Sequence, residues 1–226
     1  MELSAFTMQV LKNFATVNSN IVIKPGNNIM TMAEAKNVLG SATVPETFDR
    51  VIGIYDLPEF LSVLSLVENP QLYFKDNHVE IRAGSGRANI KYYFSDPDML
   101  TSPQKGISMP PANISFELDQ STLNNIKRAA AALGHETVSI TAVDNVIRLN
   151  VLDKDNSTSN VYSIDVAGEY DTEDFNFILN ISNLRMIPAN YKVEISSKLI
   201  SQFTSMDDDK DLTYWVALEK SSTYNA

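Results

Sequence analysis

Cysteine is absent from the 226-residue sequence, and histidine occurs only twice. Without cysteine the chain can form neither a disulfide framework nor a thiolate zinc site, which fits a reducing cytosol. The sequence also lacks a run of about 20 apolar residues, the length needed to cross a bilayer. Its N-terminus has no basic region followed by an apolar stretch, so no signal peptide is predicted. We therefore expect a soluble protein with no membrane partner.

Motifs for catalysis and for cofactors are missing as well. His78 and His135 lie far apart, and no nucleophile motif accompanies them. The segment Gly84–Arg87 (GSGR) resembles part of a phosphate loop but lacks the following Lys-Ser/Thr and helix, so a hairpin turn is expected. The acidic run 207–211 lacks the glycine and distal glutamate of a calcium loop and is expected to be solvated. These absences predict a protein that is not an enzyme and holds no metal or cofactor.

What the sequence does have is enough apolar content for a sizeable core, 44 %, together with a net charge of −10. The length predicts one large domain or two small ones. The acidic excess argues against nucleic-acid binding, because affinity for DNA comes largely from Lys and Arg. However, residues 1–106 carry a net charge of −2 and residues 107–226 carry −8. Since a total charge says little about one face, DNA binding stays open.

The order of predicted elements occurs twice. In the first half, residues 3–15 have the 3.6-residue apolar period of a helix, with Ser4 as a candidate N-cap. The other elements expected there are a hairpin in 21–32 turning at Pro25–Asn28, a strand in 50–57, a short helix in 58–67 and three strands in 71–94.

A proline-rich segment separates this half from the second. Residues Ser95–Ala112 hold four of the nine prolines and read as an interdomain connector. Beyond it we expect a strand and helix in 114–134, a hairpin turning at Asp144–Asn145, a strand in 161–170, a strand and short helix in 175–187, and closing strands in 190–206 and 212–220. A shift of 115 residues superposes the two predicted long helices, so a duplicated unit is expected. The predicted class is α+β with two tandem similar domains, 1–106 and 107–226.

Five blocks of residues resemble the sliding clamps of T-even-like bacteriophages, which are DNA polymerase processivity factors. The blocks occur in the family's order and span nearly the whole chain: LKNFATVNS (11–19), IYDLPEFLSVLSLV (54–67), FNFILN (175–180), MIPANYK (186–192) and YWVALE (214–219). The resemblance is interrupted at about 32–49, where this chain is shorter, and at about 153–160. Both interruptions read as loops.

The resemblance implies the DNA clamp fold in a closed homotrimer ring, with helices lining the hole and antiparallel sheets outside. It further implies double-stranded DNA bound without sequence preference, a DNA polymerase, an ATP-driven clamp loader, and a role in late viral transcription with its transcription factors and RNA polymerase. The expected location is the cytoplasm of the infected bacterial host. The alternative is a viral structural or assembly ring that does not bind DNA.

If helices face DNA, their exposed sides should carry no acid. On a helical wheel, the face opposite Val10 and Phe14 contains Lys12, and the face opposite Ile126 contains Lys127 and Arg128. The short helix expected in 175–187 carries Arg185. These four cations are the predicted DNA-channel residues, although any amphipathic helix can carry Lys or Arg on its polar face.

A second predicted site is a hydrophobic pocket that binds the tails of the polymerase and the loader. The resemblance suggests that it lies near the connector. Its candidate residues are Met109, Pro110, Pro111, Tyr214, Trp215 and Val216. Trp and Tyr are frequent anchors in interfaces. Because side chains alternate along a strand, some of the last three are equally expected in the core.

Overall fold

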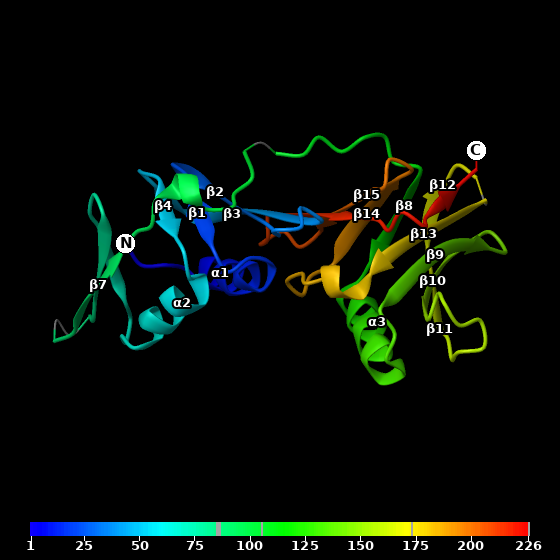
Figure 1. Cartoon of the computed structure of the whole chain (residues 1–226), viewed down its shortest axis with the longest axis horizontal. Coiled ribbons are helices and arrows are strands. Elements are labelled where there is room, and N and C mark those ends of the chain that lie inside the picture. The colour runs from blue at the N-terminus through cyan, green and yellow to red at the C-terminus, as the bar shows by residue number, and fades with distance from the viewer. Residues whose placement is uncertain (85–86, 105, 173, 226) are drawn as a thin grey trace. The chain divides into compact units, whose positions relative to one another are not determined.

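The computed structural model describes residues 1–84, 87–104, 106–172 and 174–225 (Figure 1). Backbone contacts divide the chain into two units, Met1–Lys105 and Gly106–Ala226. The division falls one residue from the boundary expected from the connector. No helix among the described residues has both the length and the apolar character of a membrane span.

Unit 1 combines two helices with short antiparallel strands. Strand β1 pairs with β4, β2 with β3, and β6 with both β5 and β7. The elements in chain order are α1 (Ala5–Val17), β1 (Ile21–Ile23), β2 (Gly26–Met32), β3 (Val38–Phe48), β4 (Ile52–Ile54), α2 (Leu57–Ser65), β5 (Gln71–Phe74), β6 (His78–Arg82), β7 (Asn89–Tyr93) and a 3-10 turn (Pro97–Met99).

Helix α1 begins where the sequence predicts. The Ser4 side chain accepts a hydrogen bond from the Thr7 backbone N–H, as an N-cap does. The carboxylate of Glu46, on β3, accepts hydrogen bonds from the Ser4 N–H and the Thr7 hydroxyl. Burial of Glu46 would raise its pKa, but these hydrogen bonds outweigh burial and lower it. The start of α1 is therefore tied to a strand as well as capped.

The predicted hairpin in 21–32 is wrong, and so is the reading of 32–49 as a loop. Strand β1 pairs with β4 rather than with β2, and the 11-residue β3 occupies much of the supposed loop. Because proline disrupts a regular ladder of hydrogen bonds, Pro45 argues against a strand when the sequence alone is considered. It is tolerated because the β2–β3 register shifts between Thr43 and Phe48, where an irregularity removes the need for a ladder hydrogen bond.

Unit 2 contains one long helix and more extensive sheets. One antiparallel sheet has the order β11-β10-β9-β13-β17, and the other strands pair in the order β12-β8-β14-β15-β16. The elements are β8 (Ile114–Leu118), α3 (Gln120–Leu133), β9 (Thr137–Val143), β10 (Val146–Leu152), β11 (Tyr162–Val166), β12 (Gly168–Tyr170), β13 (Phe175–Asn180), a 3-10 turn (Ile181–Asn183), β14 (Tyr191–Ser196), β15 (Ile200–Ser205), β16 (Leu212–Ala217) and β17 (Thr223–Tyr224).

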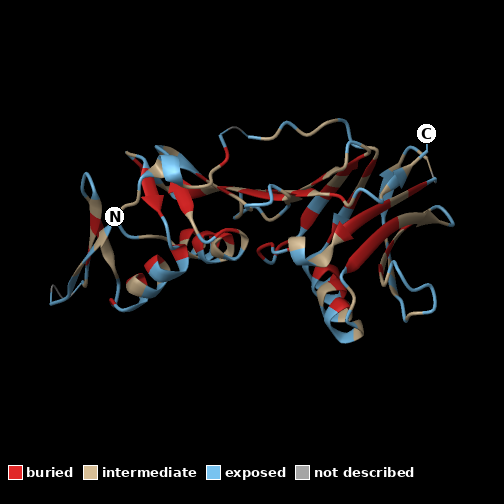
Figure 2. Ribbon diagram, in the orientation of Figure 1, coloured by how far each residue is buried: buried red, intermediate tan, exposed pale blue. Residues whose placement is uncertain are grey.

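The two units share much of their element order from the long helix onward, although unit 2 has the additional strands β8 before α3 and β17 at its end. The 115-residue shift carries α1 onto α3, and the β1–β4 pair of unit 1 corresponds to the β9–β13 pair of unit 2. The hairpin at Asp144–Asn145 is confirmed, with φ of 53° and 63°, the left-handed values that a tight two-residue turn requires. In both units the buried residues are concentrated in the strands and on part of each helix (Figure 2).

The two units differ where the sequence predicts a short helix in each of them. Unit 1 has the nine-residue α2, whereas unit 2 has only the 3-10 turn Ile181–Asn183. The residues after this turn, Leu184, Met186, Ile187 and Ala189, are all buried. A helix would expose some of these four side chains. Burial of all four therefore decides the conformation of this segment, although the spacing of its apolar residues is that of a helix. The prediction of a short helix carrying Arg185 is wrong.

The start of the connector packs on unit 1. A Cβ added to Gly53, on β4, would collide with the Ser95 carbonyl oxygen and lie 3.2 Å from Leu100 Cδ1. The Lys24 ammonium also donates to the Pro103 carbonyl oxygen at 3.2 Å. Only a glycine at position 53 lets the two backbones approach this closely.

We predict that Gly53→Ala lowers the free energy of unfolding by about 1–3 kcal/mol, the usual cost of overpacking. The matched control is Gly106→Ala, because a Cβ there would meet nothing within 4 Å. Denaturant titration of both variants measures the difference. Equal stabilities of the two variants would show that the connector does not pack against β4.

A second prediction concerns Asp119, the N-cap of α3. Its carboxylate accepts hydrogen bonds from the Ser121 hydroxyl and from the Thr122 N–H and hydroxyl, which lower its pKa. Because the folded-state pKa is depressed, this stabilisation is present above about pH 4, the unfolded value, and is lost as the pH falls further.

Replacing Asp119 by Ala should therefore cost about 1 kcal/mol at neutral pH. Asp119→Asn keeps a capping side chain but cannot titrate, so it is the control. Denaturant titrations at pH 6 and about pH 3 should show the wild type losing more stability on acidification than the Asn variant. An equal loss would mean that the cap does not depend on the charged carboxylate.

Candidate nucleic-acid interface

The polar face of α1 contains no acidic residue. Gln9, Lys12 and Thr16 are exposed, whereas Val10 and Phe14 are fully buried. Lys12 also lines a hollow of about 360 Å³ whose wall includes apolar side chains of α1, α2 and β5. The hollow also includes Glu2, which precedes the helix, so the face of α1 itself is free of acid but its surroundings are not.

Helix α2 lies beside α1 and presents hydroxyl groups (Figure 1). Ser62 and Ser65 are exposed, and their hydroxyls donate to the carbonyl oxygens of Pro58 and Ser62 at 2.9 and 2.6 Å. The one acid on this helix, Glu59, lies in the first turn, where the helix dipole favours negative charge. Apart from Glu59, the exposed face of α2 is uncharged.

The exposed face of α3 carries the other two predicted helix cations. Asn124, Arg128 and Ala131 are exposed, Lys127 is half-buried, and the helix contains no acid. Burial lowers the pKa of Lys127. Since a partly dehydrated ammonium is favoured by a nearby negative charge, an approaching phosphate would stabilise its charged form.

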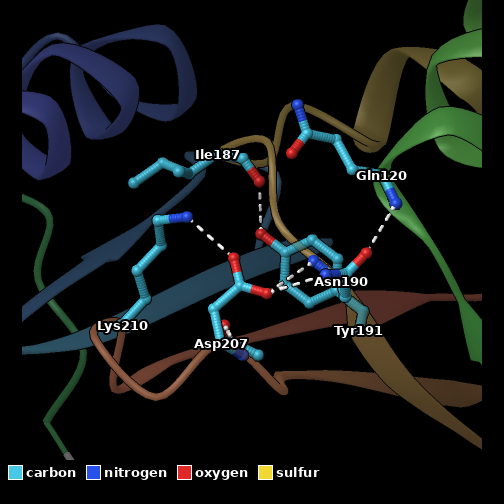
Figure 3. Close-up of polar contacts among 7 residues, drawn as sticks. Gln120, Ile187, Asn190, Tyr191, Asp207 and Lys210 are labelled. Atoms are coloured by element: carbon cyan, nitrogen blue, oxygen red, sulfur yellow. Dashed lines mark hydrogen bonds and ion pairs between the residues drawn. The ribbon is translucent and has the colours of Figure 1, made fainter.

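The N-terminus of α3 is held by a hydrogen-bond network that the sequence reading missed (Figure 3). The Gln120 N–H donates to the side-chain carbonyl of Asn190 at 3.1 Å. The Asn190 backbone N–H and side-chain amide donate to Asp207 at 3.2 and 3.0 Å, and the Lys210 ammonium donates to Asp207 at 2.7 Å. Chiefly through Lys210, these contacts lower the pKa of Asp207. This carboxylate of the acidic run therefore helps to position α3 and is not a free solvated charge.

Arg185 lies outside any helix, in the segment after the 3-10 turn. It is exposed, and its Nε donates to the Ser182 carbonyl oxygen at 2.9 Å. The segment is fixed at Ile187, whose carbonyl accepts from the Tyr191 hydroxyl and whose N–H donates to the Tyr214 hydroxyl. Burial raises the pKa of both tyrosines, so their hydroxyls stay protonated. The arginine therefore extends from a well-anchored segment.

The helix cations differ from several others in their partners. Among the described residues, Lys12, Lys127 and Arg128 form no ion pair. Arg148, by contrast, binds Asp165 through two hydrogen bonds, and Lys192 contacts Glu194. Cations without a carboxylate partner are available to phosphate groups. The arrangement suits loose contact with a polyanion and offers no fixed set of base-reading side chains.

The residues predicted for the hydrophobic pocket are not all accessible. Tyr214 and Val216 are fully buried in unit 2, so they cannot contact a partner, and we remove them from the candidates. Trp215 points to the opposite face of β16, is half-buried, and donates from its indole N–H to Gln202 at 2.8 Å. The connector residues lie in a segment without regular structure, where Met109 and Pro110 are half-buried and Pro111 is exposed.

The two histidines have different neighbours, and His78 Nε2 lies 3.8 Å from a carboxylate oxygen of Glu80. His78 Nδ1 lies 2.8 Å from the Asn77 side-chain oxygen, and His135 Nε2 lies 2.8 Å from the Asn160 carbonyl oxygen. Within the described ranges, no group of three or more His, Cys, Asp or Glu residues is arranged to hold a metal ion. The GSGR turn includes residues 85 and 86, which lie outside the described residues.

Comparison with known proteins gives matches over nearly the whole chain. Residues 4–99 match the family described as DNA polymerase processivity factor, and residues 115–220 match the family described as gp45 sliding clamp, C terminal. The chain is 34 % identical to the sliding clamp of Enterobacteria phage T4 and 30 % identical to that of Escherichia phage RB69, with all of each chain covered. It is 29 % identical to the sliding clamp of Vibrio phage KVP40, over 97 % of this chain and 99 % of the relative.

Solved structures of more distant proteins share the fold. The proliferating cellular nuclear antigen of Entamoeba histolytica superposes with a TM-score of 0.69 at 13 % identity, covering 94 % of each chain. The corresponding protein of Thermococcus kodakaraensis gives a TM-score of 0.69 at 14 % identity, covering 94 % of this chain and 95 % of that one. The expected α+β clamp fold with two domains and antiparallel sheets is thereby confirmed. The chain belongs to the phage sliding clamps, DNA polymerase processivity factors that catalyse no reaction.

Proposed function

We propose that three copies of this chain form a closed ring around duplex DNA, with α1 and α3 facing the DNA and the sheets outside. The observation that carries the proposal is the distribution of charge. The chain has 28 acidic residues against 18 Lys and Arg, yet α1 and α3 contain no acid, and their three cations form no ion pair among the described residues. A channel for a polyanion requires such faces.

The proposed contact with DNA is electrostatic and independent of sequence. Lys12, Lys127, Arg128 and Arg185 would neutralise phosphates through loose, hydrated contacts, which permit sliding. The small or uncharged neighbours Ser62, Asn124 and Ala131 give no fixed base contact. Acid elsewhere on the chain would repel DNA from surfaces outside the channel.

Two strand edges support closure into a ring. Strand β7 is the last strand of the sheet β5-β6-β7, and β11 is an end strand of the five-stranded sheet in unit 2. An exposed edge carries backbone groups that can pair with another chain. Antiparallel pairing of β7 in one subunit with β11 in the next would cover both edges, and a head-to-tail contact of this kind generates a ring.

We further propose that the ring tethers its polymerase through the surface near Trp215 and the connector residues Met109, Pro110 and Pro111. An indole held by Gln202 is an anchor of the kind found in interfaces. An ATP-driven clamp loader would open and close the ring, and late transcription factors with RNA polymerase would use the same surface. The setting is the cytoplasm of the infected bacterial host.

The alternative, a structural or assembly ring that does not bind DNA, predicts no particular charge on the helices. Such a ring would leave the polar faces of α1 and α3 free to carry acid as the rest of the chain does. The acid-free helices therefore favour the clamp.

We predict that replacing Lys12, Lys127 and Arg128 by Glu abolishes stimulation of the cognate polymerase, because the channel would then repel phosphates. The matched control replaces Lys36, Lys154 and Lys220 by Glu. These three lie outside α1 and α3, and the change of charge is the same. Stimulation is measured as the length of product in a primer-extension assay.

Light scattering provides the second readout. Both variants and the wild type should have a mass three times 25.1 kDa. If the helix variant stays trimeric and still stimulates synthesis, the channel assignment is wrong. If the wild type is a stable monomer or an even-numbered assembly, the ring itself is wrong.

A further inference from the structure

A second surface of unit 1 combines exposed tyrosines with cations. The sheet β5-β6-β7 buries Leu72, Val79 and Ile81 on one face. On the other face Tyr73, Arg82, Lys91 and Tyr93 are exposed, whereas the side chains of His78 and Glu80 are only 16 % and 14 % exposed. We call this other face the tyrosine face, and it comprises Tyr73, Lys75, His78, Glu80, Arg82, Lys91 and Tyr93. Tyr73 and Tyr93 are 44 % and 63 % exposed, which leaves much of both rings accessible to a partner.

The strand register places these side chains in rows. Tyr73, Glu80 and Lys91 lie directly opposite one another across the three strands. In the neighbouring row, His78 lies opposite Tyr93, with ring centroids 5.4 Å apart. Neighbouring strands lie about 4.8 Å apart and neighbouring rows on one face about 6.7 Å apart, so the side chains form a continuous platform rather than scattered residues.

The one carboxylate of the tyrosine face, that of Glu80, already forms an ion pair. Arg82 Nη2 lies 2.5 Å from Glu80 Oε2, and this contact, with Lys75 and Lys91 nearby, lowers the pKa of Glu80. The Arg82 guanidinium also lies 4.7 Å from the centroid of the Tyr73 ring, a cation–π geometry. Glu80 is thus neutralised locally and Arg82 is held in place.

The remaining cations have no such partner. Lys75 and Lys91 are exposed and form no ion pair among the described residues. Asp76, at the adjacent turn, is fully exposed and lies 3.8 Å from Arg50, whose closer partner is Asp49. The three cations Lys75, Arg82 and Lys91 still exceed the two acids Glu80 and Asp76, so the face has a net positive charge in a chain whose total is −10.

We propose that the tyrosine face binds an acidic segment of a partner protein. Lys75 and Lys91 would pair with its carboxylates, and the exposed rings of Tyr73 and Tyr93 would supply apolar contact area. Such a surface complements a segment of the opposite charge and repels basic ones, which gives selectivity and a fast association rate.

The charge pattern favours a peptide over a nucleic acid. Only Lys75 and Lys91 on this face lack an ion pair among the described residues, so the face offers two separate cations for carboxylates and no continuous track of cations for a phosphate backbone. A DNA-binding outer face would also compete with the proposed channel for the same ligand.

The test measures binding of a fluorescein-labelled polyglutamate peptide to the full chain by anisotropy at about 50 mM salt, where charge interactions are weakly screened. We expect binding that Lys75→Glu and Lys91→Glu each weaken by about tenfold. Combined replacement of Tyr73 and Tyr93 by Ala should also weaken binding. Lys220→Glu, which makes the same charge change at an exposed site in unit 2, should change the affinity by less than about twofold.

An oligothymidylate probe of matched length is measured in parallel. Equal losses for Lys91→Glu and Lys220→Glu would place the peptide elsewhere and overturn the proposal, as would the absence of polyglutamate binding. Oligothymidylate binding that depends on Tyr73 and Lys91 would assign the face to single-stranded nucleic acid instead. Light scattering of each variant shows whether the assembly is intact, because Lys91 lies on the edge strand β7.

Discussion

Burial of one apolar stripe on α1 and one on α3 determines which side chains the two helices expose. Val10, Leu11 and Phe14 on α1, and Leu123, Ile126 and Ala130 on α3, are packed into the core of their units. Once those positions are buried, geometry decides which side chains each helix exposes. The Glu46 contacts at the start of α1 and the Asn190–Asp207 contacts at the start of α3 hold the helices in place. The absence of acid on the exposed faces is thus a property of the folded units.

Under the proposed function, the same chain attracts DNA at one surface and avoids it elsewhere. Its acid is concentrated after residue 106, in loops and at strand positions such as Glu117 and Glu169, whereas α1 and α3 have none. Ionic interactions in water extend only about 8–10 Å at moderate salt, so a negative total does not prevent a locally positive face. The tyrosine face of unit 1 follows the same principle with a different proposed ligand.

Much of the fold could be predicted from the sequence because periodicity and caps are local signals. The apolar period of 3–15, the Ser4 cap and the Asp144–Asn145 turn each depend on a few neighbouring residues, and all three are confirmed. The pairing of β1 with β4 could not be predicted, because it joins residues about 30 positions apart, while the turn signal at Pro25–Asn28 between them indicated a hairpin of β1 with β2 instead. The short helix expected before Pro188 was lost because burial of Leu184 and Ile187 depends on tertiary contacts.

For the candidate site, the sequence predicted which residues lie on the helix faces but not what holds the helices in place. The positions of Lys12 and Arg128 follow from the helical period, whereas the role of Asp207 depends on Asn190 and Lys210, which only the fold brings together. Side-chain alternation along β16 left Tyr214 and Trp215 undecided, and the structure places the first in the core.

Encirclement of DNA is tested by comparing how well the protein is retained on circular and on linear DNA. The clamp would be loaded onto a nicked circular plasmid with its cognate loader and ATP, separated from free protein, and divided into two samples, one of which is cut once with a restriction enzyme. Encirclement predicts that the clamp stays on the circle and slides off the linear DNA, because its contacts with phosphates are too loose to hold it. Equal retention on both forms would contradict the account, since it would mean that the protein binds DNA through a surface and not by enclosing it.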